Sequence, residues 1–253
     1  MGRALHEADC AGRGLSALET SAGEKRRILI ERIPGPFASI YEKATGMVVE
    51  TYYVPLAEEI VLTLGTGRVL DLGTGPGHLP IEIVKRSPSI RVDGIDLSRA
   101  LIQRARSNAS RAGVAERLHF EVGNASRLRF ADQSYDMVIS TGMLHALKDP
   151  VQVLRECDRL LRPGAQAWIF DPARVCSCVD IRKWKGTFTL WERLMYLLFL
   201  GFARVSPGRT YDRRQVIAMI EATRFRDYEI RQEGGELRIK LIKAVPRPGV
   251  GYQ

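Results

Sequence analysis

The chain has 253 residues, of which 45% are hydrophobic and 26% are charged, and its formal net charge is +9. This composition is typical of a folded globular protein and excludes a wholly disordered chain. No apolar run reaches the about 18 residues that a membrane-spanning helix needs, and the N-terminus lacks the apolar stretch of a secretion signal. We therefore expect a cytoplasmic protein.

The four cysteines do not form a metal-binding or disulfide pattern. Cys10, Cys157, Cys176 and Cys178 show no Cys-x-x-Cys spacing. Neither a zinc site nor a disulfide framework is indicated, and we expect no metal. The close pair Cys176 and Cys178 is interpreted as two ordinary thiols, with a metal- or arsenic-binding pair as the alternative.

The N-terminal quarter is predicted to contain a tail followed by helices. Residues 1–27 have no sustained periodicity and are predicted to form a flexible tail. Residues 28–66 are predicted to form a helical cap, because apolar residues recur at three- and four-residue steps from 37 to 64. Pro55 starts its second helix. The cap can pack across the open end of a sheet, with plain helical packing as the alternative.

The remaining residues, 67–253, begin with alternating strands and helices. Strands are predicted at 69–72, 91–95, 118–122, 136–139 and 167–170, and helices at 79–86, 98–112 and 150–161. This alternation predicts an α/β fold with a Rossmann-like, doubly wound, mostly parallel sheet. In such sheets, ligands bind at the carboxyl ends of the strands.

After Asp171 the pattern changes, and residues 174–209 are predicted to be an insertion. It contains a long apolar segment at 188–202 that is too short to span a bilayer. A helix at 213–222 follows. Strands at 228–232 and 237–243 then flank Gly234-Gly235 and predict an antiparallel hairpin at the edge of the sheet.

A glycine-rich turn follows the first predicted strand. Val69 to Gly77 reads Val-Leu-Asp-Leu-Gly-Thr-Gly-Pro-Gly, so a buried strand ends in an acid and a turn before a helix. Such a turn lets a ligand approach the backbone close to free helix N–H groups. The dinucleotide fingerprint requires a third glycine at position 78, which is His78 here. A dinucleotide is therefore not favoured.

The spacing Gly73-x-Gly75-x-Gly77, with Asp71 before it, resembles the class I S-adenosylmethionine (SAM) dependent methyltransferases. Four later segments match that family in order: Asp96 ending the second strand, Gly123-Asn124-Ala125, Ser134 to Ser140, and Leu160-Leu161-Arg162-Pro163-Gly164. The resemblance covers roughly residues 37–243. Within the class, the chain is most similar to the ubiquinone/menaquinone-type C-methyltransferases and related small-molecule methyltransferases.

The resemblance implies that SAM is the cofactor and that the methyl acceptor is a small, hydrophobic molecule. It implies cofactor contacts from Tyr41, Asp71, Gly73, Thr74, Gly75, Gly77, Asp96, Leu97, Asn124, Ala125 and Ser140. The Asp96 carboxylate suits a ribose diol, and the ring of Tyr41 can attract a sulfonium. Asn124 stands where the family more often has aspartate. Leu144-His145 replaces the usual Arg-Asn of the quinone group, which leaves the substrate open.

His145 is the candidate catalytic base. It follows the fourth predicted strand on a loop whose counterpart lines the active site in the family. An imidazole with an ordinary pKa of about 6.5 suits proton acceptance at neutral pH. Structural packing of this histidine is the alternative. Asp171 ends the fifth strand and is interpreted either as a substrate contact or as a carboxylate that starts a loop.

The basic excess lies in residues 174–253, which hold 16 of the 38 Lys and Arg but only 8 of the 29 Asp and Glu. A solvated surface is the default interpretation. The alternatives are peripheral contact of residues 182–209 with an anionic membrane and a lid over a lipophilic or anionic acceptor. Nucleic acid is not expected, because no aromatic-studded basic strand is present.

Two alternative functions stay open at this level. The chain could methylate a thiol or a metalloid, which Cys176 and Cys178 would serve, or it could be a non-catalytic SAM-binding scaffold protein. The sequence does not indicate an oligomeric state.

Overall fold

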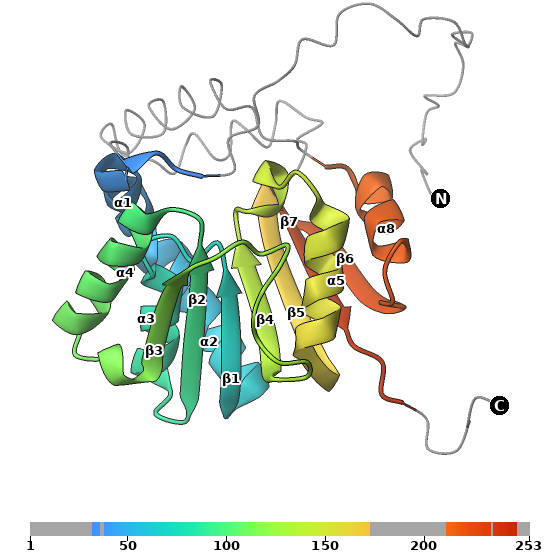
Figure 1. Ribbon diagram of the computed structural model, residues 1–253, viewed down its shortest axis with the longest axis horizontal. Coiled ribbons are helices and arrows are strands. Elements are labelled where there is room, and N and C mark those ends of the chain that lie inside the picture. Colours follow the sequence, from blue (N-terminus) through green and yellow to red (C-terminus); the bar gives the residue numbers. More distant parts are fainter. Residues whose placement is uncertain (1–31, 36–37, 173–210, 234, 247–253) are drawn as a thin grey trace, which may run out of the picture.

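A computed structural model describes residues 32–35, 38–172, 211–233 and 235–246. The fold is a twisted sheet with helices on both faces (Figure 1). Its strands are β1 Gly67–Leu72, β2 Ile90–Asp96, β3 Leu118–Val122, β4 Tyr135–Thr141, β5 Leu161–Pro172, β6 Asp227–Glu233 and β7 Glu236–Ile242. Its helices of nine or more residues are α1 Ala38–Gly46, α2 Val54–Leu64, α3 His78–Arg86, α4 Arg99–Arg111, α5 Pro150–Leu160 and α8 Arg213–Glu221.

The strand order is β3-β2-β1-β4-β5-β7-β6. Strands β1 to β5 pair in parallel, whereas β7 is antiparallel to both β5 and β6. This arrangement confirms the predicted Rossmann-like sheet with an antiparallel hairpin at one edge. Because β1, β2, β4 and β5 run in the same direction, their carboxyl ends meet along a single edge of the sheet, which is where a ligand is expected.

Two apolar layers hold the sheet between the helices. Leu70 and Leu72 of β1 pack in the cluster that contains residues of α5 and α8. Val69, one position away, packs in the opposite cluster with residues of α2, α3 and α4. This alternation follows from the two-residue period of a strand. By the same alternation, Asp71 lies on the same side of β1 as Val69, near the carboxyl end of the strand, where the glycine turn begins.

Two local predictions differ from the structure. Leu161 was predicted to end a helix but begins β5, where it pairs with Tyr135 of β4. The strand therefore includes Pro163-Gly164, which the sequence indicated only as a helix terminator. Residues Val49–Tyr53 form a short π-helix, η2, and Pro55 lies in the first turn of the α2 helix that follows. A proline in the first turn is tolerated, because its missing N–H has no partner there.

Several sequence predictions lie outside the described residues. They include the tail at 1–27, the insertion at 174–209 with its apolar segment 188–202, and the membrane or lid contact through 182–209. Cys176 and Cys178 lie there too, and the division into tail, cap and core stays a prediction. Within the part of the chain that the structure describes, no helix has both the length and the apolar character needed to cross a bilayer.

Gly94 in β2 lies close both to Phe120 and to Thr74 of the glycine turn. A Cβ added to it would lie 2.6 Å from Cδ1 of Phe120 and 2.7 Å from Oγ1 of Thr74. We expect Gly94→Ala to lower the free energy of unfolding by about 1–3 kcal/mol, because the buried neighbours must move. Chemical denaturation measures this. The matched control is Gly35→Ala, whose Cβ would meet nothing within 4 Å; equal stability of the two variants would contradict the expectation.

Candidate active site

The glycine turn reverses the chain tightly at the carboxyl end of β1. The backbone N–H groups of Gly73 and Thr74 donate to the carbonyl oxygen of Ile95 in β2, at 2.8 and 3.0 Å. Gly73, Gly75 and Gly77 have φ angles of 74°, 54° and 80°. Residues other than glycine rarely adopt these left-handed conformations. The turn is therefore fixed on the sheet, and its conformation explains why glycine occupies alternate positions.

A narrow hollow lies beside this turn. It is lined by Tyr41, Tyr53, Asp71, Gly73, Thr74, Gly75, Pro76, His78, Leu79 and Thr141. These residues come from α1, η2, β1, the glycine turn, α3 and the end of β4. The ring of Tyr41 passes close to the turn, since a Cβ on Gly75 would lie 3.4 Å from its Cε1 atom.

Asp71 brings a buried carboxylate to the hollow. Its exposed fraction is 1%. Burial raises its pKa to about 7, the neighbouring Thr74 side chain opposes that rise, and the charge of Asp96 adds to it. The Thr74 hydroxyl lies close enough to Asp71 to lower its pKa, but Oδ1 of Asp71 and Oγ1 of Thr74 make no hydrogen bond of good geometry with any described residue. A buried acceptor without a donor costs free energy, so these two atoms indicate that a polar ligand completes the site.

Asp96 at the end of β2 joins the glycine turn to the start of α4. Its Oδ2 atom accepts from the backbone N–H of Gly75 at 3.0 Å, and Oδ1 accepts from that of Ser98 at 2.7 Å. Burial raises the pKa of this carboxyl, and the two backbone donors oppose that shift. A carboxylate has about four lone-pair positions, so Asp96 keeps capacity for a ligand diol.

His145 and Asp171 form a hydrogen-bonded pair where β4 and β5 end. Oδ1 of Asp171 lies 3.1 Å from Nδ1 of His145, and Oδ2 accepts from the His145 backbone N–H at 3.0 Å. The Asp171 side chain is 1% exposed and that of His145 is 28% exposed. Burial disfavours the imidazolium, but the hydrogen bond and charge of Asp171 outweigh it and raise the pKa of His145.

The loop that carries His145 contacts the glycine turn. A Cβ on Gly73 would lie 3.0 Å from the sulfur of Met143, so this side chain packs directly on the turn. The N–H of Gly142 donates to the carbonyl oxygen of Phe170 at 2.7 Å, which ties the loop to β5. The histidine–aspartate pair is thus built beside the hollow.

The structure brings some of the predicted cofactor residues together and separates others. Five of them line the hollow: Tyr41, Asp71, Gly73, Thr74 and Gly75. Asp96 does not line it but accepts a hydrogen bond from the backbone N–H of Gly75, which does. Besides Asp96, the predicted residues outside its lining are Gly77, Leu97, Asn124, Ala125 and Ser140.

Gly77 and Ser140 have structural partners of their own. The N–H of Gly77 donates to the carbonyl oxygen of Thr74 at 3.0 Å, and its Cα faces Ala105 and Phe120. The hydroxyl of Ser140 donates to the carbonyl oxygen of Leu72 at 3.0 Å, which links β4 to β1. A cofactor role for these two residues stays a prediction.

The sequence missed Thr141 and the pairing of Asp171 with His145. Thr141 extends β4 two residues past its predicted end and lines the hollow. The sequence signal that could have indicated this is that Ser140 and Thr141 continue the strand residues before Gly142 breaks them. His78 also lines the hollow, and its Nε2 lies 3.4 Å from the carbonyl oxygen of Glu42 in α1.

Comparison with known proteins identifies the family. A methyltransferase domain model matches residues 65–234. This chain belongs to the methyltransferase domain family. Its identity to the ubiquinone/menaquinone biosynthesis C-methyltransferase UbiE of Geotalea daltonii is 26% over 190 residues, covering 75% of this chain and 76% of that protein. The predicted family, and its position near the UbiE group, are confirmed.

Two further comparisons agree. The 27-O-demethylrifamycin SV methyltransferase of Amycolatopsis mediterranei is 35% identical over 104 residues, covering 41% of this chain and 38% of that protein. A crystal structure from Methanococcus maripaludis, assigned as a SAM-dependent methyltransferase, superposes with a TM-score of 0.67 at 19% identity, covering 91% and 100% of the two chains. The protein is a SAM-dependent methyltransferase of Rossmann-like fold, as predicted.

The residues of the hollow fit this cofactor. Asp71 offers a buried acceptor whose Oδ1 atom makes no hydrogen bond of good geometry among the described residues, and Gly73 and Gly75 in the lining carry no Cβ. A SAM molecule carries an ammonium, a sulfonium and a ribose diol, and the two carboxylates of Asp71 and Asp96 match that positive and donor-rich character.

Proposed function

We propose that the protein transfers the methyl group of SAM to a small, hydrophobic acceptor, and that His145 removes a proton from the acceptor. The observation that carries this proposal is the hydrogen bond between the buried Asp171 and the partly exposed His145, on a loop whose Met143 packs on the glycine turn. A solvent-exposed histidine without such a carboxylate would have no defined tautomer. The names of two relatives, a C-methyltransferase of ubiquinone/menaquinone biosynthesis and a 27-O-demethylrifamycin SV methyltransferase, also support a small-molecule acceptor.

We place the cofactor along the carboxyl ends of β1, β2 and β3. Asp71 would accept from a donor group at the amino acid end of the cofactor, and Asp96 would accept from the ribose hydroxyls. Asn124 and Ala125, in the turn after β3, would border the adenine. Tyr41 lies over Gly75 and would cover the cofactor from the side of α1. When bound, SAM supplies an electrophilic methyl group on a sulfonium.

Asp171 fixes both the position and the tautomer of His145. Since the carboxylate accepts at Nδ1, we assign the imidazole proton to Nδ1 and the lone pair to Nε2. Nε2 then accepts the proton that the nucleophilic atom of the acceptor loses as the methyl group is transferred. The negative Asp171 stabilises the imidazolium that forms. Positioning of acceptor and methyl in line supplies the rest of the rate enhancement.

An acceptor panel tests this function. The purified enzyme is incubated with SAM and with hydroxylated aromatic, quinol, thiol, amine and arsenite acceptors, and release of S-adenosylhomocysteine is measured. Turnover with a hydrophobic phenol or quinol supports the proposal. Turnover only with thiols or arsenite, abolished in the Cys176→Ser/Cys178→Ser double variant, would replace it by the thiol or metalloid alternative. SAM binding with no turnover on any acceptor would favour the scaffold alternative.

The pH dependence provides a separate test of His145. Because the base acts in its neutral form and Asp171 raises its pKa, kcat should rise with pH through a midpoint above about 6.5. Asp171→Asn removes the negative charge that raises this pKa, so the midpoint should move to lower pH. Steady-state kcat from pH 5.5 to 9 measures both profiles.

The matched control is Asp149→Asn, which changes a carboxylate that caps α5 by accepting from the backbone of Gln152. Its profile should coincide with that of the wild type. If Asp171→Asn gives the same midpoint as the wild type, His145 is not the titrating base.

A further inference from the structure

The connection between β3 and β4 lacks the usual crossover helix. Residues 123–134 are all described and contain only turns and one isolated bridge, between Asn124 and Arg127. Parallel strands are normally joined by a helix that satisfies its own backbone groups. Here the carbonyl oxygens of an irregular segment need donors from elsewhere, because unpaired buried backbone groups are costly.

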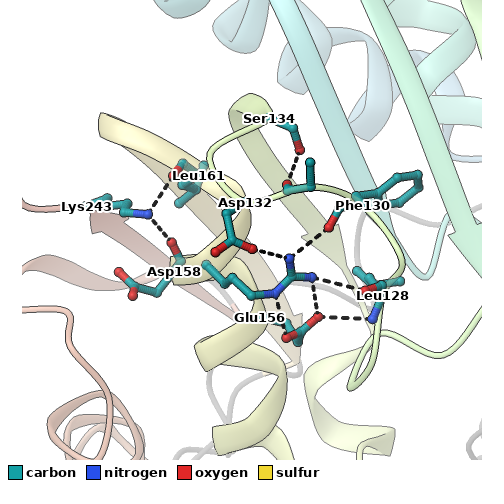
Figure 2. Close-up of polar contacts among 10 residues, drawn as sticks. Leu128, Phe130, Asp132, Ser134, Glu156, Asp158, Leu161 and Lys243 are labelled. Atoms are coloured by element: carbon teal, nitrogen blue, oxygen red, sulfur yellow. Dashed lines mark hydrogen bonds and ion pairs between the residues drawn. The ribbon is translucent and has the colours of Figure 1, made fainter.

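Arg159 in the last turn of α5 supplies those donors. Its Nη1 atom donates to the carbonyl oxygen of Phe130 at 2.8 Å and to Oδ1 of Asp132 at 2.7 Å. Its Nη2 atom donates to the carbonyl oxygen of Leu128 at 3.1 Å. Figure 2 shows Leu128, Phe130 and Asp132 arranged along the connection around this guanidinium.

Glu156, one turn earlier on α5, completes the cluster. It accepts from Nε and Nη2 of Arg159 at 3.0 and 2.9 Å, so all five N–H groups of the guanidinium have acceptors. Glu156 Oε2 also accepts from the backbone N–H of Leu128 at 3.0 Å. The pair therefore holds both the N–H and the carbonyl oxygen of one residue in the connection. Only a planar, forked cation can make this set of contacts.

The same helix holds the connection at its two ends. The side-chain amide of Gln152 donates to the carbonyl oxygen of Ser126 at 3.4 Å, and the N–H of Gln133 donates to the carbonyl oxygen of Arg159 at 3.0 Å. Helix α5 thus fixes the segment from residue 126 to residue 133.

The fixed segment directly follows the turn that carries Asn124 and Ala125. Oδ1 of Asn124 accepts from the N–H of Ser126 at 2.9 Å. The N–H of Gly123 donates to the backbone carbonyl oxygen of Asp96 at 3.1 Å, so the turn starts beside the end of β2. Leu128, held by Glu156 and Arg159, is buried with Ala125 in the same apolar cluster.

We infer that Arg159 is a positioning residue for the cofactor, which fixes the β3–β4 connection and thereby holds the Asn124–Ala125 turn against the adenine of SAM. The inference rests on the proposed cofactor contact of this turn. Arg159 itself touches neither cofactor nor acceptor. Its effect is therefore on cofactor affinity and on the order of the connection, with little effect on the chemical step.

The test compares Arg159→Met with the control Arg155→Met. Arg155 is an exposed arginine one turn earlier on α5, and it donates to the carbonyl oxygen of Ala222 and not to the connection. SAM affinity is measured by calorimetry, kcat at saturating SAM by steady-state kinetics, and amide hydrogen exchange over residues 123–134. We expect Arg159→Met to weaken SAM binding about tenfold and to speed exchange in this segment, with kcat within about threefold of wild type. Arg155→Met should change none of these.

Two more variants separate the role of the Asn124–Ala125 turn from the role of Arg159. Asn124→Ala tests the turn itself: if it leaves SAM affinity unchanged, the proposed adenine contact is wrong and the inference fails with it. If Asn124→Ala weakens SAM and Arg159→Met does not, only the role of Arg159 is overturned. Should Arg159→Met not fold, Arg159→Lys decides, because lysine keeps the charge but loses the fork; SAM affinity within twofold of wild type would overturn the inference.

Discussion

Asp71→Asn is expected to weaken SAM binding by about 10- to 100-fold, because it removes the charge of an acceptor whose Oδ1 atom makes no hydrogen bond of good geometry among the described residues. The same substitution should stabilise the ligand-free protein above pH 7. A carboxyl whose pKa is raised to about 7 binds its proton in the folded state and loses it in the unfolded state between about pH 4 and 7. Over that interval the free energy of unfolding falls as the pH rises.

The raised pKa corresponds to about 4 kcal/mol of destabilisation at pH 8. Asparagine removes this charge but leaves a buried amide, so we expect a net gain of about 1–2 kcal/mol in the free energy of unfolding. Calorimetry with SAM and urea denaturation at pH 5 and pH 8 measure the two effects. Asp227→Asn, at an exposed position on β6, is the control. Loss of both binding and stability would mean that Asp71 has a structural role only.

His145→Ala is expected to lower kcat by about 10²- to 10⁴-fold, the range that general-base catalysis commonly supplies. SAM affinity should stay within a few-fold of wild type, because His145 lies outside the lining of the hollow at the glycine turn. Added imidazole should restore part of the rate, since the deleted ring leaves space beside Asp171. Single-turnover methyl transfer from preloaded enzyme separates this effect from product release.

The control for this substitution is His119→Ala, which removes an exposed histidine of β3 whose ring lies 3.6 Å from Glu121. It should leave kcat unchanged. A His145→Ala enzyme with the wild-type rate would show that the acceptor is methylated without loss of a proton to this residue, and that the alternative of structural packing is correct.

The sheet and the glycine turn were predictable because their signals are local. Apolar runs that end in turn residues predicted β1 to β5, and the spacing of Gly73, Gly75 and Gly77 reflects φ angles that the structure contains. The family followed from motifs of this kind. By contrast, β5 begins six residues earlier than its predicted start at 167, because Leu161 pairs with Tyr135 on a neighbouring strand, and that pairing leaves no mark in the local sequence.

The histidine–aspartate pair could not be predicted for a related reason. His145 and Asp171 were each singled out, but they are 26 positions apart and meet only because β4 and β5 are neighbours in a defined register. The role of Arg159 was hidden in the same way. It stands next to the Leu-Leu-Arg-Pro-Gly motif, and nothing near it in the sequence indicates that its partners lie 27 to 31 positions earlier.

A crystal structure of the complex with S-adenosylhomocysteine tests the central claim most directly. We predict a donor of the ligand within hydrogen-bond distance of Asp71 Oδ1, the ribose hydroxyls at Asp96, the adenine beside Asn124 and Ala125, and the sulfur on the side of the loop that carries His145. A ligand bound elsewhere, or one whose sulfur faces away from His145 with Asp71 Oδ1 still lacking a donor, would contradict the proposed site and the proposed base together.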